Sequence, residues 1–247
     1  MNADQNRVAA PTFSPLYRQI KEFMIKSLEA GEWGPGAVIP SESELAQRFS
    51  VSQGTVRKAI DEMAAENLLV RRQGKGTFVA THSDPRSYFR FLRLMPDDGT
   101  PDASRSEPLS CRTEPASAEV AAVLGLSPGD PVVVMERLLR FDGTPVVLDA
   151  IYLTGADLPN LSLERLQAGG RSLYSLLESD YGIRMIRADE RLRAVAADAR
   201  AAKYLEVEEG SPLLLVERVA FTYGNKPVEW RRGLYSTRNH HYHNELG

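Results

Sequence analysis

The sequence predicts an α+β protein of two domains, residues 1–82 and residues 83–247, and three observations support this division. The first domain contains three short segments of helical periodicity, followed by a glycine-rich hairpin. A Ser-Asp-Pro stretch within residues 82–88 then indicates a linker. Beyond it, a pattern of helix, turn and paired strands occurs twice at an offset of 81 residues. The second domain is therefore expected to be α+β with a mainly antiparallel sheet.

The first two helices have identifiable start signals. The first is expected over Ser14–Glu29, where apolar residues recur every three or four positions and Ser14 is the expected N-cap. A second, shorter helix is expected to follow Ser41, because Ser41 and Glu44 have the spacing of a capping box.

The third helix is expected to begin after Ser52 and to end near Glu66. Its apolar positions cluster on one side, and its first turns have small, hydroxyl and basic side chains elsewhere, which suits entry into a major groove. Residues 68–79 then alternate into two short strands around a glycine-rich tip with basic side chains. Together these features predict a winged helix-turn-helix. The residues expected to contact double-stranded DNA are Ser52, Gln53, Thr55, Arg57, Lys58, Arg72, Lys75 and Gly76.

Net charge alone does not predict DNA binding. The chain has a formal charge of −3, and residues 1–82 contain 10 Lys and Arg against 9 Asp and Glu, a balance of +1. The affinity for DNA must therefore come from the local placement of basic side chains and from the two DNA-binding domains of a dimer acting together.

Several classes of protein and site are not expected. A single cysteine, Cys111, excludes an intramolecular disulfide and a cysteine metal cluster. No apolar run is long enough to span a membrane, and residues 1–10 lack a signal core, so a cytoplasmic protein is expected. Neither a cofactor nor a metal site is expected, and no catalytic residue is assigned, since Ser172 has no neighbouring histidine to activate it.

Two strands of the second domain each place one charge on an apolar face. The strand Val132–Phe141 places Arg137 there, and the strand within Ile183–Ala196 places Glu190. A buried charge is costly without a partner. Two explanations remain open, an internal ion pair between Arg137 and Glu190 or a ligand site.

A third strand, Pro227–Tyr235, has Glu229, Arg231 and Tyr235 on one face. The pattern fits a ligand pocket and a solvated outer face equally well. An arginine-rich pocket would favour a small anionic metabolite such as a carboxylate or phosphate ester.

The N-terminal domain resembles the GntR family of bacterial regulators. The segments that match are residues 15–20, 39–46, 51–59 and 74–79. The resemblance implies a homodimer on a palindromic operator, with the third helix in the major groove and the wing in the minor groove. Many members have arginine at the position of Gln53, and glutamine pairs with adenine edges where arginine favours guanine.

The second domain resembles the UTRA effector domain of the HutC subfamily, whose fold is like that of chorismate lyase. The segments that match are residues 136–138, 143–145, 172–178, 181–183 and 227–235. The resemblance places Arg137, Ser172, Glu229 and Tyr235 in the effector pocket. With the strand pattern, the expected effector-binding residues are Arg137, Ser172, Glu190, Glu229, Arg231 and Tyr235. Relatives often have arginine at Leu139 and glutamate at Asp149, so the effector is not restricted to the amino-sugar phosphates that some of them bind.

These observations lead to the expectation of a ligand-responsive regulator, a repressor released from its operator by a small anionic metabolite. The alternative is an enzyme that uses the lyase-like domain, with the DNA-binding head as a targeting module. That alternative requires a complete acid–base set in the pocket, whereas the sequence offers arginines and a few carboxylates that suit binding equally well.

Overall fold

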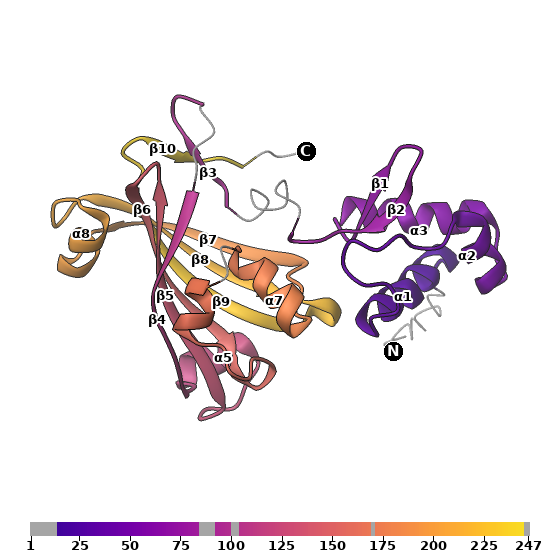
Figure 1. Cartoon of the computed structure of the whole chain (residues 1–247), viewed down its shortest axis with the longest axis horizontal. Helices are drawn as coiled ribbons and strands as arrows, with labels where there is room; N and C mark the ends of the chain where they lie inside the picture. The colour runs from indigo at the N-terminus through magenta and orange to yellow at the C-terminus, as the bar shows by residue number, and fades with distance from the viewer. Residues whose placement is uncertain (1–13, 84–91, 100–103, 169–170, 245–247) are drawn as a thin grey trace, which may run out of the picture. The chain divides into compact units, whose positions relative to one another are not determined.

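The computed structural model describes residues 14–83, 92–99, 104–168 and 171–244 (Figure 1). The chain divides into two compact units, residues 1–80 and residues 81–247. Most of the expected linker, residues 84–88, lies outside the described residues.

The first unit is a winged helix-turn-helix, as predicted. Its elements are α1 (Leu16–Glu29), α2 (Glu42–Phe49), α3 (Gln53–Ala65), β1 (Leu69–Arg72) and β2 (Gly76–Val79). The two strands pair antiparallel, with Arg72 opposite Gly76 beside the tip. The predicted cap of the first helix is wrong, because Pro15 occupies the N-cap position and no side chain caps the helix.

Local hydrogen bonds explain where α2 and α3 begin. The Ser41 hydroxyl accepts from the Glu44 amide at 3.3 Å, and the Glu44 carboxylate accepts from the Ser41 amide at 2.8 Å. The Ser52 hydroxyl caps α3 by accepting from the Thr55 amide at 3.2 Å. Between the helices Ser50 adopts a left-handed conformation with φ 53°, which ends α2 and turns the chain into α3.

The core of the first unit lies among its three helices. Met24 of α1, Leu45 of α2, and Val56, Ile60 and Met63 of α3 are each at most 1% exposed. The three α3 positions are spaced by four and three residues, so they form one apolar stripe. Burying a side chain of this size stabilises the fold by roughly 1.5–3 kcal/mol. This packing orients α3 and leaves most of its first turns exposed on the opposite side.

The second unit is built on one six-stranded antiparallel sheet, which confirms the predicted α+β class. The strand order is β4-β5-β6-β9-β8-β7, and β3 pairs with β10 separately. The strands are β3 (Leu94–Pro96), β4 (Ser104–Pro115), β5 (Pro131–Phe141), β6 (Thr144–Thr154), β7 (Arg187–Ala196), β8 (Pro212–Phe221), β9 (Pro227–Tyr235) and β10 (His240–Tyr242). The helices are α5 (Ala118–Leu124), α6 (Leu163–Ala168), α7 (Leu173–Tyr181) and α8 (Ala199–Leu205), with short 3-10 turns η1 (Gly155–Asp157) and η2 (Tyr223–Asn225).

The internal repeat of the sequence is a repeat of the structure. The elements β4-α5-β5-β6 recur as β7-α8-β8-β9, so the strand order is symmetric about the central β6–β9 pair. Turn hydrogen bonds also recur at the offset of 81. The Ala116 amide donates to the Asp130 carbonyl and the Ala197 amide to the Ser211 carbonyl, both at 2.8 Å. The two halves therefore share backbone geometry as well as element order.

The two faces of the sheet are covered differently. Helices α5 and α8 pack on one face, where Leu124 and Trp230 belong to one cluster and Leu205 and Leu148 to another. On the other face, α7 covers one apolar cluster, and the residues of the β3–β10 pair contribute to a second. Both clusters on this second face adjoin a row of charged side chains that the sheet buries.

Candidate functional sites

Strand register brings six charged residues to one face of the sheet. Arg137 of β5 lies opposite Asp149 of β6, and Arg231 of β9 lies opposite Arg218 of β8. Arg218 in turn lies opposite Glu190 of β7. Cross-strand partners project to the same face of a sheet, so these side chains converge. The charged belt, as we call it, consists of Arg137, Asp149, Glu190, Arg218, Glu229 and Arg231.

Arg137 and Glu190 belong to separate ion pairs. Arg137 donates from Nε and Nη2 to Asp149 Oδ2, both at 2.8 Å, and these side chains are 8% and 0% exposed. Glu190 accepts from Arg218 Nε at 2.6 Å and from the Tyr242 hydroxyl. Of the two explanations left open by the sequence, the internal ion pair between Arg137 and Glu190 does not form. The reason is topological, since β5 and β7 are four strand spacings apart, about 19 Å.

The charged residues of β9 are buried, which excludes the solvated-face explanation. Glu229, Arg231 and Tyr235 are 0%, 5% and 1% exposed. Arg231 Nη2 donates to Glu229 Oε2 at 3.0 Å, and Arg231 Nη1 lies 3.5 Å from Asp149 Oδ2. The Tyr174 hydroxyl of α7 donates to Glu229 Oε1 at 3.0 Å. Arg231 thus links the Asp149 end of the belt to α7.

Burial and neighbouring charge set the protonation states in the belt. Burial by itself lowers the pKa of Arg231, but the attraction of Glu229 and Asp149 outweighs it, and the pKa lies well above its usual value. Burial, reinforced by Asp149, raises the pKa of Tyr235 to about 12. Burial and then Glu229 raise the pKa of Tyr174. At neutral pH Arg231 is therefore charged, and both phenols keep their protons and can donate.

Two buried polar atoms of the belt lack a hydrogen-bond partner among the described residues. They are Asp149 Oδ1, an acceptor, and Arg231 Nε, a donor. Buried polar atoms without a partner are rare and costly, so an acceptor and a donor in one site favour a role in binding. Gly233 makes the room here, because a Cβ at this position would lie 2.6 Å from Asp149 Oδ1 and 2.5 Å from the Tyr235 ring.

Ser172 has a structural role at the start of α7. Its hydroxyl caps α7 by accepting from the Ser175 amide at 3.2 Å, and the residue is half-buried. The cap fixes the start of the helix that presents Tyr174 to the belt.

Sequence reasoning did not place Asp149, Arg218 or Tyr174 among the expected effector-binding residues. Two of them had a usable signal. Arg218 stands 81 residues after Arg137, the offset of the internal repeat, and Asp149 is a single charge within an apolar strand. Tyr174 had no such signal, since an aromatic residue in a short apolar helix is typical of a core.

Helix α3 contains four of the eight residues expected to contact DNA. Gln53, Arg57 and Lys58 are exposed and Thr55 is half-buried. Arg57 is not independent of its own unit, because its Nε and Nη2 both lie 2.8 Å from Glu42 Oε2. That hydrogen bond and the charge of Glu42 raise the pKa of Arg57.

Three more of the expected contacts lie in the hairpin, and Ser52 is the N-cap of α3. Arg72 places its guanidinium 4.7 Å from the centroid of the Phe78 ring, and Lys75 and Gly76 lie at the exposed tip. Gly76 has φ 106°, a conformation that L side chains rarely adopt. Lys58 of α3 instead rests its amine 4.0 Å from the centroid of the Tyr17 ring.

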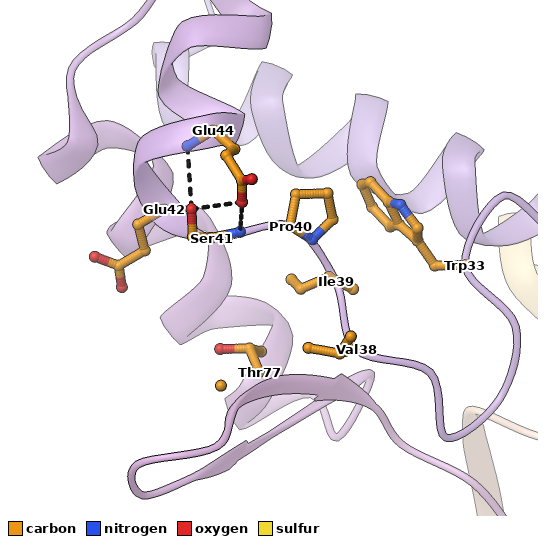
Figure 2. Close-up of a pocket in the computed structure, with 9 residues that line it drawn as sticks. Trp33, Val38, Ile39, Pro40, Ser41, Glu42, Glu44 and Thr77 are labelled. Atoms are coloured by element: carbon orange, nitrogen blue, oxygen red, sulfur yellow. Dashed lines mark hydrogen bonds between the residues drawn. The ribbon is translucent and has the colours of Figure 1, made fainter.

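Figure 2 shows a hollow in the first unit between the hairpin and the start of α2. Its lining is Trp33, Val38, Ile39, Pro40, Ser41, Glu42, Glu44, Gly76 and Thr77. The dashed lines in Figure 2 mark the capping box, in which Glu44 is engaged with Ser41. Glu42 holds Arg57. Because the carboxylates of Glu42 and Glu44 already have partners within the first unit, we assign this hollow to the packing at the start of α2 and not to a ligand site.

Among the described residues, no group of three His, Cys, Asp or Glu side chains is arranged to hold a metal ion. None of the described helices is long and apolar enough to cross a membrane.

Comparison with known proteins decides the family. Residues 101–241 match the UTRA domain, and residues 16–79 match the gntR family of bacterial regulatory proteins. The chain is 30% identical to the uncharacterized HTH-type transcriptional regulator YurK of Bacillus subtilis, over 87% of this chain and 88% of that protein. This chain belongs to the GntR family of regulators that carry a UTRA domain.

Other relatives agree with this assignment. The chain is 28% identical to the histidine utilization repressor of Pseudomonas putida, over 92% of this chain and 90% of the relative. Among solved structures, the ligand-binding domain of a protein assigned to the GntR family from Bordetella bronchiseptica shares 47% identity, with a TM-score of 0.61. It covers 64% of this chain and 98% of that one. Since these relatives and domains are transcriptional regulators, this GntR protein is a regulator and not an enzyme, and the enzyme alternative is set aside.

Proposed function

We propose that this GntR regulator is a cytoplasmic homodimeric repressor that leaves a palindromic operator when a small anionic metabolite binds the charged belt. The observation that supports the effector site is the belt itself. It places three arginines and three carboxylates on one face of the sheet, and its members Asp149 and Arg231 each have a buried atom without a partner among the described residues.

The charge balance of the belt defines how an anion would bind. Three arginines face three carboxylates, so the described belt has no surplus positive charge. An anion must therefore share guanidinium donors with the resident carboxylates. Among the described residues, Arg137 contacts Asp149 through Nε and Nη2, both on one carboxylate oxygen, whereas a guanidinium has five N–H donors. The donors of Nη1 suit a carboxylate or phosphate oxygen.

Repression is supported by the relatives. The chain is 26% identical to a protein described as a probable fructoselysine utilization operon transcriptional repressor from Shigella flexneri, over 86% of this chain. It is also 27% identical to the transcriptional repressor NagR of Bacillus subtilis. The exposed side of α3 and the wing tip are the surfaces proposed to meet the operator.

The test begins with the full chain and a random pool of DNA duplexes. Selection should recover duplexes with two inverted half-sites, as a symmetric dimer requires. The Arg57→Ala variant should bind the recovered duplex more weakly, by roughly tenfold or more for a lost charged contact. A recovered site without inverted symmetry would contradict the palindromic operator.

The effector is then sought by thermal shift of the full chain with a panel of metabolic carboxylates and sugar phosphates. A compound that binds the native state raises the melting temperature. Its shift should disappear in Arg137→Lys, which keeps a positive charge beside Asp149 but loses the planar fork. If a compound releases the duplex equally well from Arg137→Lys, the belt is not the effector site.

A further inference from the structure

The first residues after the DNA-binding unit are tied to helix α7 of the second unit. The first unit ends at Ala80, and Glu178 of α7 binds the next residues with one carboxylate oxygen. Glu178 Oε2 accepts from the Thr81 hydroxyl at 2.5 Å and from the His82 amide at 2.9 Å. Thr81 and His82 together with Glu178 are called the latch below.

Further contacts hold the same segment on α7 and on the residues that follow this helix. The ring nitrogen Nε2 of His82 lies 2.9 Å from the Met185 carbonyl, and its ring meets the Tyr174 ring edge to face at 5.3 Å between centroids. The Ser83 and Ser175 hydroxyls are 3.1 Å apart. The start of the linker is therefore ordered by side chains of α7.

The carboxylate of the latch is buried beside a charged side chain. Glu178 and Arg184 are 6% and 4% exposed, and Arg184 Nε lies 3.5 Å from Glu178 Oε1. His82 is 9% exposed. Hydrogen bonds to a buried carboxylate are stronger than those between neutral groups, so the two bonds to Glu178 are a main contribution to holding Thr81 and His82 in place.

Helix α7 also contacts the charged belt. Tyr174 stands four residues before Glu178, so the two side chains leave the same side of the helix. The Tyr174 hydroxyl donates to Glu229 Oε1 at 3.0 Å, and Glu229 Oε2 accepts from Arg231. Tyr174 is thus in contact with the belt through its hydroxyl and with His82 through its ring.

We propose that α7 couples the charged belt to the linker, with Tyr174 as the positioning residue between them. The proposal rests on the proposed role of the belt as effector site. An anion that engages Arg231 competes with Glu229 for the guanidinium, and Glu229 then presents a different acceptor geometry to Tyr174. When the Tyr174 hydroxyl moves with its acceptor, the Tyr174 ring moves as well, and the packing of this ring on His82 changes. Effector binding thereby loosens the latch and shifts the population of conformations at Thr81 and His82.

The test measures amide hydrogen exchange at His82 in the full chain, in the absence of any effector. The variant Glu178→Gln weakens the latch itself. Tyr174→Phe keeps the ring beside His82 but removes the hydroxyl that reaches Glu229. The matched control is Tyr152→Phe, since Tyr152 stacks on Trp230 in the cluster on the opposite face of the sheet. Circular dichroism of each variant checks that the fold is kept.

We expect Glu178→Gln to accelerate exchange at His82 by about tenfold, the effect of one lost charged hydrogen bond. Tyr174→Phe should accelerate it several-fold, and Tyr152→Phe should leave it unchanged. The double variant Tyr174→Phe with Glu178→Gln should exchange less than the product of the two single effects, because both act on one latch.

Two outcomes would overturn the coupling. One is an unchanged His82 exchange rate in Tyr174→Phe, and the other is single effects that multiply in the double variant. Neither outcome depends on a metabolite, so a failed coupling is distinguishable from a failed effector site, which the Arg137→Lys experiment addresses separately.

Discussion

The buried pair of Arg137 and Asp149 allows one prediction to be worked out in energy. The substitution Arg137→Met keeps much of the side-chain volume but leaves the Asp149 carboxylate buried without its main partner. Breaking a buried pair in this way costs about 3–5 kcal/mol. Arg231 Nη1 remains 3.5 Å from the same Asp149 oxygen and compensates in part. The expected loss in free energy of unfolding is therefore near the lower end, about 3 kcal/mol.

The assay is urea denaturation of the second unit, followed by fluorescence of Trp230. The chain has two tryptophans, and the substitution Trp33→Phe in every variant removes the signal of the first unit. A matched control lies on the same strand. Arg140 of β5 pairs with Glu107 at 2.9 Å, but those side chains are 29% and 48% exposed. Arg140→Met should cost about 0–1 kcal/mol, as exposed ion pairs do.

A second variant separates the charge from the volume. Adding Asp149→Asn to Arg137→Met removes the uncompensated carboxylate, so the double variant should be more stable than Arg137→Met alone. The reasoning is refuted if Arg137→Met costs no more than Arg140→Met, because the burial of the pair would then have no energetic consequence.

Three other perturbations have defined outcomes. Glu42→Gln removes the carboxylate that holds Arg57, so Arg57 becomes available to a DNA phosphate. Anisotropy titrations against a random duplex should show tighter binding, and the plot of log binding constant against log salt concentration should steepen by about 0.9. An unchanged affinity would contradict this. Gly233→Ala places a Cβ 2.5 Å from the Tyr235 ring and should lower the free energy of unfolding in urea by roughly 1–3 kcal/mol. Burial and Asp149 raise the pKa of Tyr235 from 10.0 to about 12, so the native state holds this proton more tightly than the unfolded chain. The corresponding stability is complete below pH 10.0 and is lost as the pH rises through about 12, and Tyr235→Phe should lessen that loss in urea titrations across this range.

The sequence alone determined the architecture, because that information is local and periodic. The capping box at Ser41 and Glu44 and the cap at Ser52 depend on residues three apart, so they can be recognised without a structure. The 81-residue repeat is also visible in the letters, and it predicted the two related halves of the sheet. Strand alternation is also a local property, and it predicted that Arg137 and Glu190 each lie on an apolar strand face, where Arg137 is buried and Glu190 is half-buried.

Only the tertiary structure decided which charges meet. Strands β6, β9 and β8 lie between β5 and β7, so Arg137 and Glu190 cannot meet. Arg137 pairs with Asp149 of the adjacent strand β6, and Glu190 pairs with Arg218 of β8, which the repeat places at the position equivalent to Arg137. Pairing across a sheet depends on strand order, and strand order is a property of the whole fold. The contacts of Tyr174 with the belt and with His82 are likewise long-range, and no periodicity of the sequence encodes them.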